Sequence, residues 1–575
     1  MQPPAASPQR ASTAVGLPPQ RNARADALSR TRGTPVAAAA PAPAPKPAAP
    51  APQRLSLVAD AADPAVAAPP PPPAPAQAPA PADRYTNYYT PPPAPSSLFP
   101  GRDTSRIESF ASNPTQTTRE NPVSTFSIDV DTASYSYVRR ILQGGAVPQP
   151  QTVRVEELVN YFPYEWKGPD SKDTPFKANV SVLPTPWNSD TKLMHIAIKG
   201  YDISRAEKPR ANLVFLIDVS GSMEPADRLP LLKTAFRMLV NTLSPDDTVA
   251  IVTYAGTSAV ALQPTKASDK ARIIEAIAKL QAGGSTNGAD GLRQAYRLAR
   301  ESFIKDGVNR VMLATDGDFN VGQTSDADLR QLIEDERRSG VYLSVFGVGL
   351  DNLNDRMMQQ IAQAGNGIAA YIDNLAQAQK VLVQEATSSI FPIANDVKIQ
   401  VEFNPATIAE YRLIGYETRA LERQDFNNDH VDAGDIGSGH TVTAIYEITP
   451  KGSPAQRVDD LRYGRKAPAT DGGDDEYGFV KIRYKLPGGT RSTLITTPVT
   501  RNNAISSFAA ASSDQRFSVA VAAFAQKLRR SDQLSDFSYD AIIDIANGAK
   551  GSDPYGYRGE FISLVRLASA LLPNP

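Results

Sequence analysis

Apolar runs and amphipathic stretches alternate through the middle of the chain. Residues 213–217 form a continuous apolar run that predicts a buried strand over 211–217. Residues 226–243 carry apolar residues at the spacing of a helix. The alternation continues with strands predicted at 248–254, 258–263, 310–315, 341–348 and 368–372, and helices at 268–280, 288–303, 326–338, 354–364 and 375–390. This order predicts an α/β fold with a mostly parallel sheet covered by helices on both faces.

Strand-like patterns flank the α/β region on both sides. Before it, helices predicted at about 134–143 and 154–161 precede strand-like alternation over 176–200. After it come strand-like runs at 396–403, 410–416, 440–448, 478–486 and 492–499, then helices at 504–529, 534–547 and 558–571. We therefore expect a β-rich domain made from 176–200 and 393–500, with the α/β unit inserted in it or attached to it and helices at the carboxyl end.

The first part of the chain has a different composition. Roughly half of the 50 prolines of the whole chain lie within the first 100 residues. They occur in runs such as Pro69–Pro73 that favour extended polyproline II and build no packed core. We expect four segments: a disordered Pro/Ala-rich spacer over 1–115, an amino-terminal region of helices and strands over 116–208, the α/β domain over 209–390, and a β-rich and helical domain over 391–575.

Composition excludes several classes of function. The net charge of −1 supplies no electrostatic attraction to nucleic acid, so we expect no nucleic-acid partner. The absence of cysteine excludes disulfides, iron–sulfur clusters, thiolate zinc sites and cysteine nucleophiles. The three histidines, His195, His430 and His440, leave little room for a histidine-based metal or general-base site.

Hard oxygen ligands follow three strands of the predicted sheet. Asp218, Ser220 and Ser222 end the first strand, Thr286 lies in a glycine-containing loop before the helix at 288–303, and Asp316 ends the strand at 310–315. Each loop alone is typical of a helix N-cap. Because the carboxyl ends of parallel strands meet at one edge of a sheet, the three together predict a site for Mg²⁺ or Mn²⁺.

These loops resemble the metal-ion-dependent adhesion site of the von Willebrand factor type A domain, whose motif is Asp-x-Ser-x-Ser followed by Thr and Asp. The resemblance covers about 209–390, and Asp218, Ser220, Ser222, Thr286 and Asp316 occupy the five positions. The blocks 122–135 and 153–162 resemble the amino-terminal region of bacterial YfbK-like proteins. The block 432–444 resembles the carboxyl-terminal domain of the same family, whose function is uncharacterised.

The resemblance implies a Rossmann-like fold and a cation, Mg²⁺ or alternatively Mn²⁺ or Ca²⁺. The hydroxyls would contact the cation directly and the two carboxylates directly or through water. One position would stay open for an acidic side chain of a partner protein. We expect a non-enzymatic, cation-dependent protein-binding module. The alternatives are a metal-dependent adaptor of an AAA+ ATPase and a metal-dependent hydrolase, although no histidine between 196 and 429 offers the latter a general base.

Two other acidic motifs have simpler interpretations. Asp129-Val130-Asp131-Thr132-Ala133 resembles the nucleophile loop of haloacid-dehalogenase phosphatases, but Ala133 replaces the expected Thr or Val, which favours a helix cap or turn. The acidic loop over 425–435 could bind Ca²⁺, and a solvated turn is the interpretation that we favour.

Location is inferred from the spacer and the family. The Pro/Ala-rich segment favours the cell envelope or periplasm, and the alternative is the cytoplasm. Family members often carry an export or lipoprotein signal, whereas the first residues here lack an apolar core of signal-peptide length. No apolar stretch is long enough to span a membrane. We therefore expect membrane anchoring only through a segment absent from this chain, such as a lipid anchor in a longer form.

Overall fold

The computed structural model describes residues 111–572, apart from short internal gaps. The gaps are 205–206, 287, 318–325, 350–354, 386–387, 389, 432, 460–474 and 535. The predicted spacer over 1–115 therefore lies outside the described residues except for its last five positions. The expected domain boundaries at 208/209 and 390/391 stay predictions.

A six-stranded sheet forms the α/β domain, in the order β10-β9-β8-β5-β6-β7. All neighbouring strands run parallel except the edge pair β6 and β7, which is antiparallel. The strands are β5 (Ala211–Asp218), β6 (Thr248–Tyr254), β7 (Ser258–Lys266), β8 (Val308–Thr315), β9 (Val341–Val348) and β10 (Ala369–Ile372). Every residue of the central strands β5 and β8 is buried, as expected for a parallel sheet covered on both faces.

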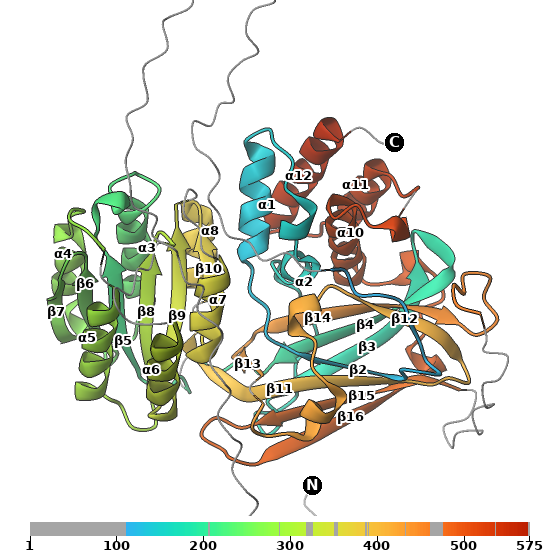
Figure 1. The fold of residues 1–575 in the computed structure, drawn as a ribbon, viewed down its shortest axis with the longest axis horizontal. Coiled ribbons are helices and arrows are strands. Elements are labelled where there is room, and N and C mark those ends of the chain that lie inside the picture. Colours follow the sequence, from blue (N-terminus) through green and yellow to red (C-terminus); the bar gives the residue numbers. More distant parts are fainter. Residues whose placement is uncertain are drawn as a thin grey trace, which may run out of the picture. The chain divides into compact units, whose positions relative to one another are not determined.

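Helices cover both faces of this sheet (Figure 1). Phe215 and Ile217 of β5 pack with apolar residues of α3, α4 and α8, whereas Val214 and Leu216 pack with those of α5, α6 and α7. The helices are α3 (Leu229–Thr242), α4 (Lys270–Lys279), α5 (Gly288–Glu301), α6 (Asp326–Arg338), α7 (Asp355–Ala364) and α8 (Leu375–Gln379). The predicted α/β architecture is confirmed.

Two further sheets pack face to face to form a β-sandwich. The first has the order β1-β12-β14-β4-β3, and the second has β13-β11-β15-β16 with β2 also paired to β11. The strands of the first are β1 (Gln116–Thr117), β3 (Phe176–Thr185), β4 (Asn188–Gly200), β12 (Ile408–Ile414) and β14 (Thr441–Pro450). Those of the second are β2 (Val123–Ser127), β11 (Pro392–Phe403), β13 (Gly434–Gly437), β15 (Glu476–Lys485) and β16 (Ser492–Thr500).

Strand pairing confirms that the α/β domain is inserted in the β-rich domain. β4 precedes the α/β domain in the sequence and β14 follows it, yet the two strands pair directly, from Lys192 with Ile448 to Lys199 with Thr441. The segments on either side of the insertion therefore share one sheet.

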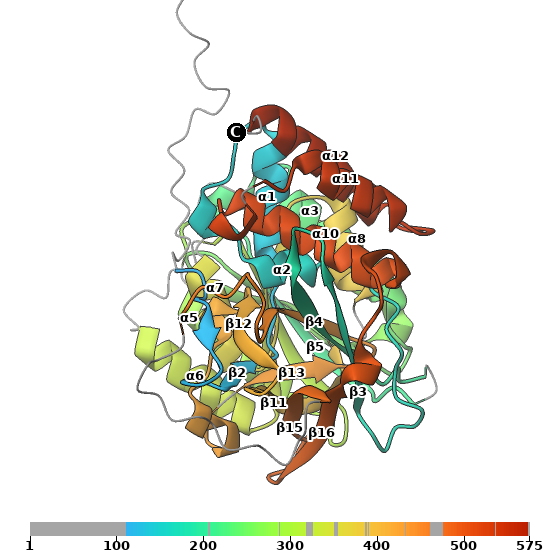
Figure 2. The ribbon, with the colours of Figure 1, turned by 90° about the vertical axis from the view of Figure 1, so that its right-hand side faces the viewer.

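A layer of helices covers the outer face of the first sheet (Figure 2). Ile196 and Ile198 of β4 lie in the core between the two sheets, whereas Leu193 packs against the helices. His195 points the same way as Leu193, because its Nε2 lies 2.9 Å from the Ser518 hydroxyl of a covering helix. The layer consists of α1 (Ala133–Gln143), α2 (Val155–Val159), α10 (Ser513–Leu528), α11 (Tyr539–Gly548) and α12 (Tyr557–Leu571).

The structure differs from the predicted elements at several places. The helix expected over 375–390 stays α-helical only to Gln379, continues as a π-helical stretch over Lys380–Gln384, and is followed by β11 from Pro392. The helix expected from 504 begins at Ser513, because Ser512 and Gln515 form a capping box there. The four-residue strand β13 was not expected, because a Gly-Asp-Ile-Gly segment carries no strand pattern. No described helix has the length and apolarity needed to cross a membrane.

Candidate metal centre

Asp218 is the last residue of β5 and lies fully buried beneath the loop that follows. Its Oδ1 accepts a hydrogen bond of 2.8 Å from the backbone N–H of Ser220. Its Oδ2 is also buried and has no hydrogen-bond partner of suitable geometry among the described residues. A buried carboxylate oxygen without a donor is costly, so this atom is well suited to face a cation.

The two serines follow on a short 3₁₀ turn over Gly221–Met223. Ser220 is buried and Ser222 is exposed, and their hydroxyl oxygens lie 3.0 Å apart. The spacing of two residues thus places both hydroxyls on one side of the loop, next to Asp218. Because Ser222 is exposed, this part of the site is open to solvent.

The loop with Thr286 is hydrogen-bonded to the serine loop. The backbone N–H of Gly221 donates to the Gly284 carbonyl at 3.0 Å, and that of Gly283 donates to the Val219 carbonyl at 2.7 Å. Gly284 has a φ of 87°, in the left-handed region that favours glycine. Thr286 is half-buried two residues further on, just before α5.

Asp316 follows β8 and is connected to the serine loop by an arginine. One guanidinium nitrogen of Arg228, Nη1, donates to Asp316 Oδ2 at 2.7 Å and to the Ser222 carbonyl at 2.7 Å. Both side chains of this ion pair are buried. Arg228 precedes α3 and belongs to no recognisable motif, so reasoning from the sequence missed it.

The electrostatics of the site leave few uncompensated charges. Burial raises the pKa of Asp218 to about 6; hydrogen bonds from Ser220 lower it and the charge of Asp316 raises it. Asp218 is therefore ionised at neutral pH. Arg228 compensates the charge of Asp316. A cation held here would face one uncompensated carboxylate together with neutral hydroxyls, so it would keep much of its affinity for a further anionic ligand.

The donor set fits a hard cation. Two carboxylates and three hydroxyls are oxygen ligands of the kind that Mg²⁺ binds together with water. No group of three or more His, Asp or Glu residues in the described part of the chain is arranged to hold a metal. The predicted site contains only two carboxylates, so its hydroxyls would have to complete it. The five residues stay predicted ligands, held on three loops that are joined by hydrogen bonds and the Arg228 ion pair.

Comparison with known proteins identifies the regions of the chain. Residues 212–384 match the von Willebrand factor type A domain, 102–195 match a von Willebrand factor model, and 388–571 match the carboxyl-terminal region of the uncharacterised protein YfbK. The chain is 47% identical to uncharacterised YfbK of Escherichia coli (strain K12) over 478 residues, covering 81% of this chain and 82% of the relative. The chain belongs to the YfbK-like family of type A domain proteins. Type A domains commonly carry a metal-dependent site for protein interactions.

Two further similarities have lower sequence identity and cover a smaller share of the chain. Uncharacterised protein sll0103 of Synechocystis is 26% identical over 334 residues, covering 56% of this chain and 74% of that protein. A solved structure described as von Willebrand factor type A from Catenulispora acidiphila covers 69% of this chain and 91% of its own, with 19% identity and a TM-score of 0.38.

The acidic motifs outside the type A domain are engaged in structural contacts. Asp131 accepts a hydrogen bond from the Ala369 backbone N–H at 3.0 Å and pairs with Arg419 at 2.9 Å. In the loop over 425–435, Asp429 pairs with Arg483 at 3.0 Å, and the carbonyls of Asp425 and Asn428 accept hydrogen bonds from a lysine. These contacts favour a structural role for both motifs.

Proposed function

We propose that the chain is a non-enzymatic protein-binding module of the cell envelope that captures an acidic side chain of its partner in a Mg²⁺-dependent manner. The observation that carries the proposal is the buried carboxylate of Asp218 at the meeting point of three oxygen-rich loops. Its Oδ2 has no hydrogen bond of full geometry among the described residues, and the Tyr254 hydroxyl lies near the carboxyl group. A bound Mg²⁺ would supply an electrophilic coordination position that an external carboxylate can complete.

Two features of the site support binding rather than catalysis. The ion pair between Arg228 and Asp316 reduces the negative charge of the donor set, which favours an additional anionic ligand. The type A domain contains no histidine, and the buried His195 is engaged by Ser518 in the helical layer. The placement in the envelope rests on the Pro/Ala-rich composition of the first 100 residues.

Calorimetric titration with MgCl₂ tests the metal site. Asp218→Ala should weaken Mg²⁺ binding by about a hundredfold or more, because it removes the charged ligand with the unpartnered oxygen. Asp290→Ala is the matched control, because Asp290 is exposed in the first turn of α5 and pairs with the exposed Arg293. Equal Mg²⁺ binding by wild type and Asp218→Ala would contradict the metal site.

Partner capture tests the proposed function separately. Immobilised wild type and the Asp290→Ala variant should retain the same protein from an envelope extract in Mg²⁺ and release it in EDTA, whereas Asp218→Ala should retain none. Circular dichroism should show that all three proteins are folded. Capture that persists in EDTA, or that Asp218→Ala preserves, would overturn the proposal even if Mg²⁺ binds.

A further inference from the structure

A second polar site lies at the other edge of the type A sheet. Arg310 is the third residue of β8, whereas Asp316 directly follows the last residue of that strand. Six residues of an extended strand separate the two by roughly 20 Å. Arg310 therefore belongs to the amino-terminal edge of the sheet, away from the predicted metal centre.

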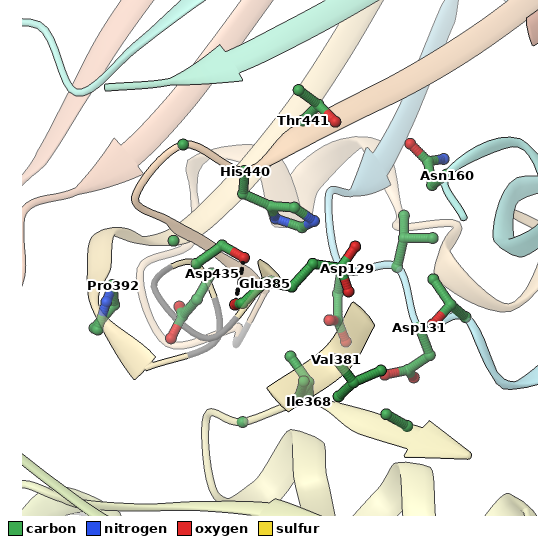
Figure 3. A pocket seen from close by; sticks show the side chains of 18 of the residues that line it. Asp129, Asp131, Asn160, Ile368, Val381, Glu385, Pro392, Asp435, His440 and Thr441 are labelled. Carbon is green, nitrogen blue, oxygen red and sulfur yellow. Dashed lines mark hydrogen bonds between the residues drawn. The ribbon is translucent and has the colours of Figure 1, made fainter. Parts of the chain in front are cut away.

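Arg310 lines a cavity of ≈ 740 Å³ between the type A domain and the β-sandwich. Figure 3 shows other residues of the cavity wall. The cavity wall includes the segment before β10, the π-helical stretch after α8, the residues that connect β2 to α1, and the loop between β13 and β14. Its volume is within the range of sites for small molecules. Apolar side chains such as Ile368, Val381 and Pro392 alternate with charged ones in this wall.

The guanidinium of Arg310 is only partly satisfied. The residue is 3% exposed, and Nη1 donates to the Ser344 hydroxyl at 2.8 Å and at 3.5 Å to the Asn366 carbonyl. Nε has no hydrogen-bond partner among the described residues. The Tyr342 ring lies 5.4 Å from the guanidinium carbon and supplies a cation–π contact. A guanidinium has five N–H donors. Nε is buried, and Nη2 makes no hydrogen bond among the described residues, so Nη2 is the donor left for a ligand in the cavity.

The charge of Arg310 is also poorly compensated. Burial lowers its pKa to about 10, while Tyr342 and then the carboxylate of Asp435 act in the opposite direction. The other cations of the cavity differ in this respect. Arg419 pairs with Asp129 and Asp131, and Lys380 pairs with Glu385. Keeping a buried arginine without a paired carboxylate costs free energy unless an anion arrives from outside.

We propose that this cavity binds a small organic molecule through its carboxylate, with Arg310 as the anchoring residue. A carboxylate would supply the negative charge for which Arg310 has no ion-pair partner among the described residues. A phosphate dianion would bring excess negative charge among Asp129, Asp435 and Glu385, all of which line the same cavity (Figure 3). The apolar side chains of the wall can cover the rest of such a molecule. The site requires no metal and is separate from the proposed protein-binding function.

Titration of the full chain with sodium benzoate tests the site, with sodium phosphate in parallel at equal ionic strength and with EDTA present. The wild type should bind benzoate saturably and more tightly than phosphate. Arg310→Met should weaken benzoate binding at least tenfold, and Arg310→Lys should give an intermediate value because it keeps the charge and loses the planar guanidinium. Thermal melting should show that both variants are folded.

Lys208→Gln is the matched control, because Lys208 lines the same cavity and carries the same charge. Its benzoate affinity should stay within about twofold of the wild type, since Arg310 supplies the donor that anchors the carboxylate. An absence of saturable benzoate binding to the wild type, or equal binding by Arg310→Met, would overturn the site. If Lys208→Gln lost as much benzoate affinity as Arg310→Met, the binding would depend on the general positive charge of the cavity. The assignment of Arg310 as a specific anchor would then be overturned. Tighter binding of phosphate would overturn the assignment to a carboxylate.

Discussion

Two buried arginines at the borders of the type A domain differ in how their charges are compensated. Arg139 of α1 pairs with Asp373 after β10 and with Glu560 of α12, and it also donates to the Tyr161 hydroxyl at 3.0 Å. Arg310 has a serine hydroxyl, a distant carbonyl and an aromatic ring, but no ion pair among the described residues. Both side chains are almost fully buried.

The pKa values reflect the same difference. Burial lowers the pKa of Arg139, but its partners Tyr161 and Asp373 outweigh burial and raise the pKa above its ordinary value. For Arg310, burial is the largest influence and the pKa falls. Arg139 therefore holds three parts of the chain together, whereas Arg310 carries a cost that binding of an anion would offset.

Replacing Arg139 should have the largest effect. Arg139→Met should lower the free energy of unfolding by about 3–5 kcal/mol, because it leaves the buried Asp373 without its cation. Urea denaturation measures the loss. Adding Asp373→Asn to the Arg139→Met variant should recover part of the stability. A loss below about 1 kcal/mol would show that the network is not structural.

Replacing Arg228 at the predicted metal centre should have an effect of intermediate size. Arg228→Gln should tighten Mg²⁺ binding by roughly tenfold, because it removes a positive charge that competes for Asp316. Calorimetry measures the change, and Arg237→Gln on the exposed face of α3 is the control that should leave the affinity unaltered. Weaker Mg²⁺ binding by Arg228→Gln would mean that the hydrogen bond to the Ser222 carbonyl matters more than the charge.

A pH effect should arise at Asp131, near the cavity. Burial, and then the charge of Asp129, raise the pKa of Asp131 to about 8, while Arg419 lowers it. The folded state thus holds this proton more tightly than the unfolded state, so the contribution to stability is present below pH 4 and is lost as the pH rises to about 8.

Asp131→Asn should therefore flatten the dependence of stability on pH between 5 and 8, by about 1 kcal/mol per pH unit. Urea denaturation at several pH values measures the slope. Asp335→Asn, at an exposed ion pair on α6, should keep the wild-type slope. An unchanged slope in Asp131→Asn would show that Asp131 is already ionised across this range.

The smallest effect on stability is expected for Arg310. Arg310→Met should change the free energy of unfolding by less than about 1 kcal/mol, because relief from burying a poorly compensated charge offsets the lost bond to Ser344. Urea denaturation beside Arg139→Met provides the direct comparison. A loss as large as that of Arg139→Met would show that Arg310 is a structural residue.

The α/β core was predictable because each of its elements has a strong local pattern. The apolar run ending at Asp218 predicted β5 to within one residue, and the limits of α6 and β9 were predicted as observed. Patterns failed where local structure depends on contacts. The π-helical stretch after Gln379 and the short strand β13 have no periodicity of their own.

The two candidate sites also differ in how far the sequence predicts them. The predicted metal ligands follow strands of one sheet, so the topology alone brings their loops to one edge. Arg228 lacks a motif and was found only through its bonds to Asp316 and Ser222. The Arg310 cavity is assembled from segments as distant as Asp129 and His440, whose proximity depends on how the inserted domain packs against the sandwich. No pattern along the chain predicts that contact.

The insertion of the type A domain also determines how it would carry mechanical load. The chain enters the domain from β4 and leaves it into β11. β4 is paired on both sides, by β14 and β3, and β11 is paired by β15 and by β2 with β13. Tension from a captured partner would therefore be divided between two strands in different sheets. β4 and β11 would each have to break their hydrogen bonds to strands on both sides before the domain could detach. The sandwich would therefore hold the inserted domain at two points.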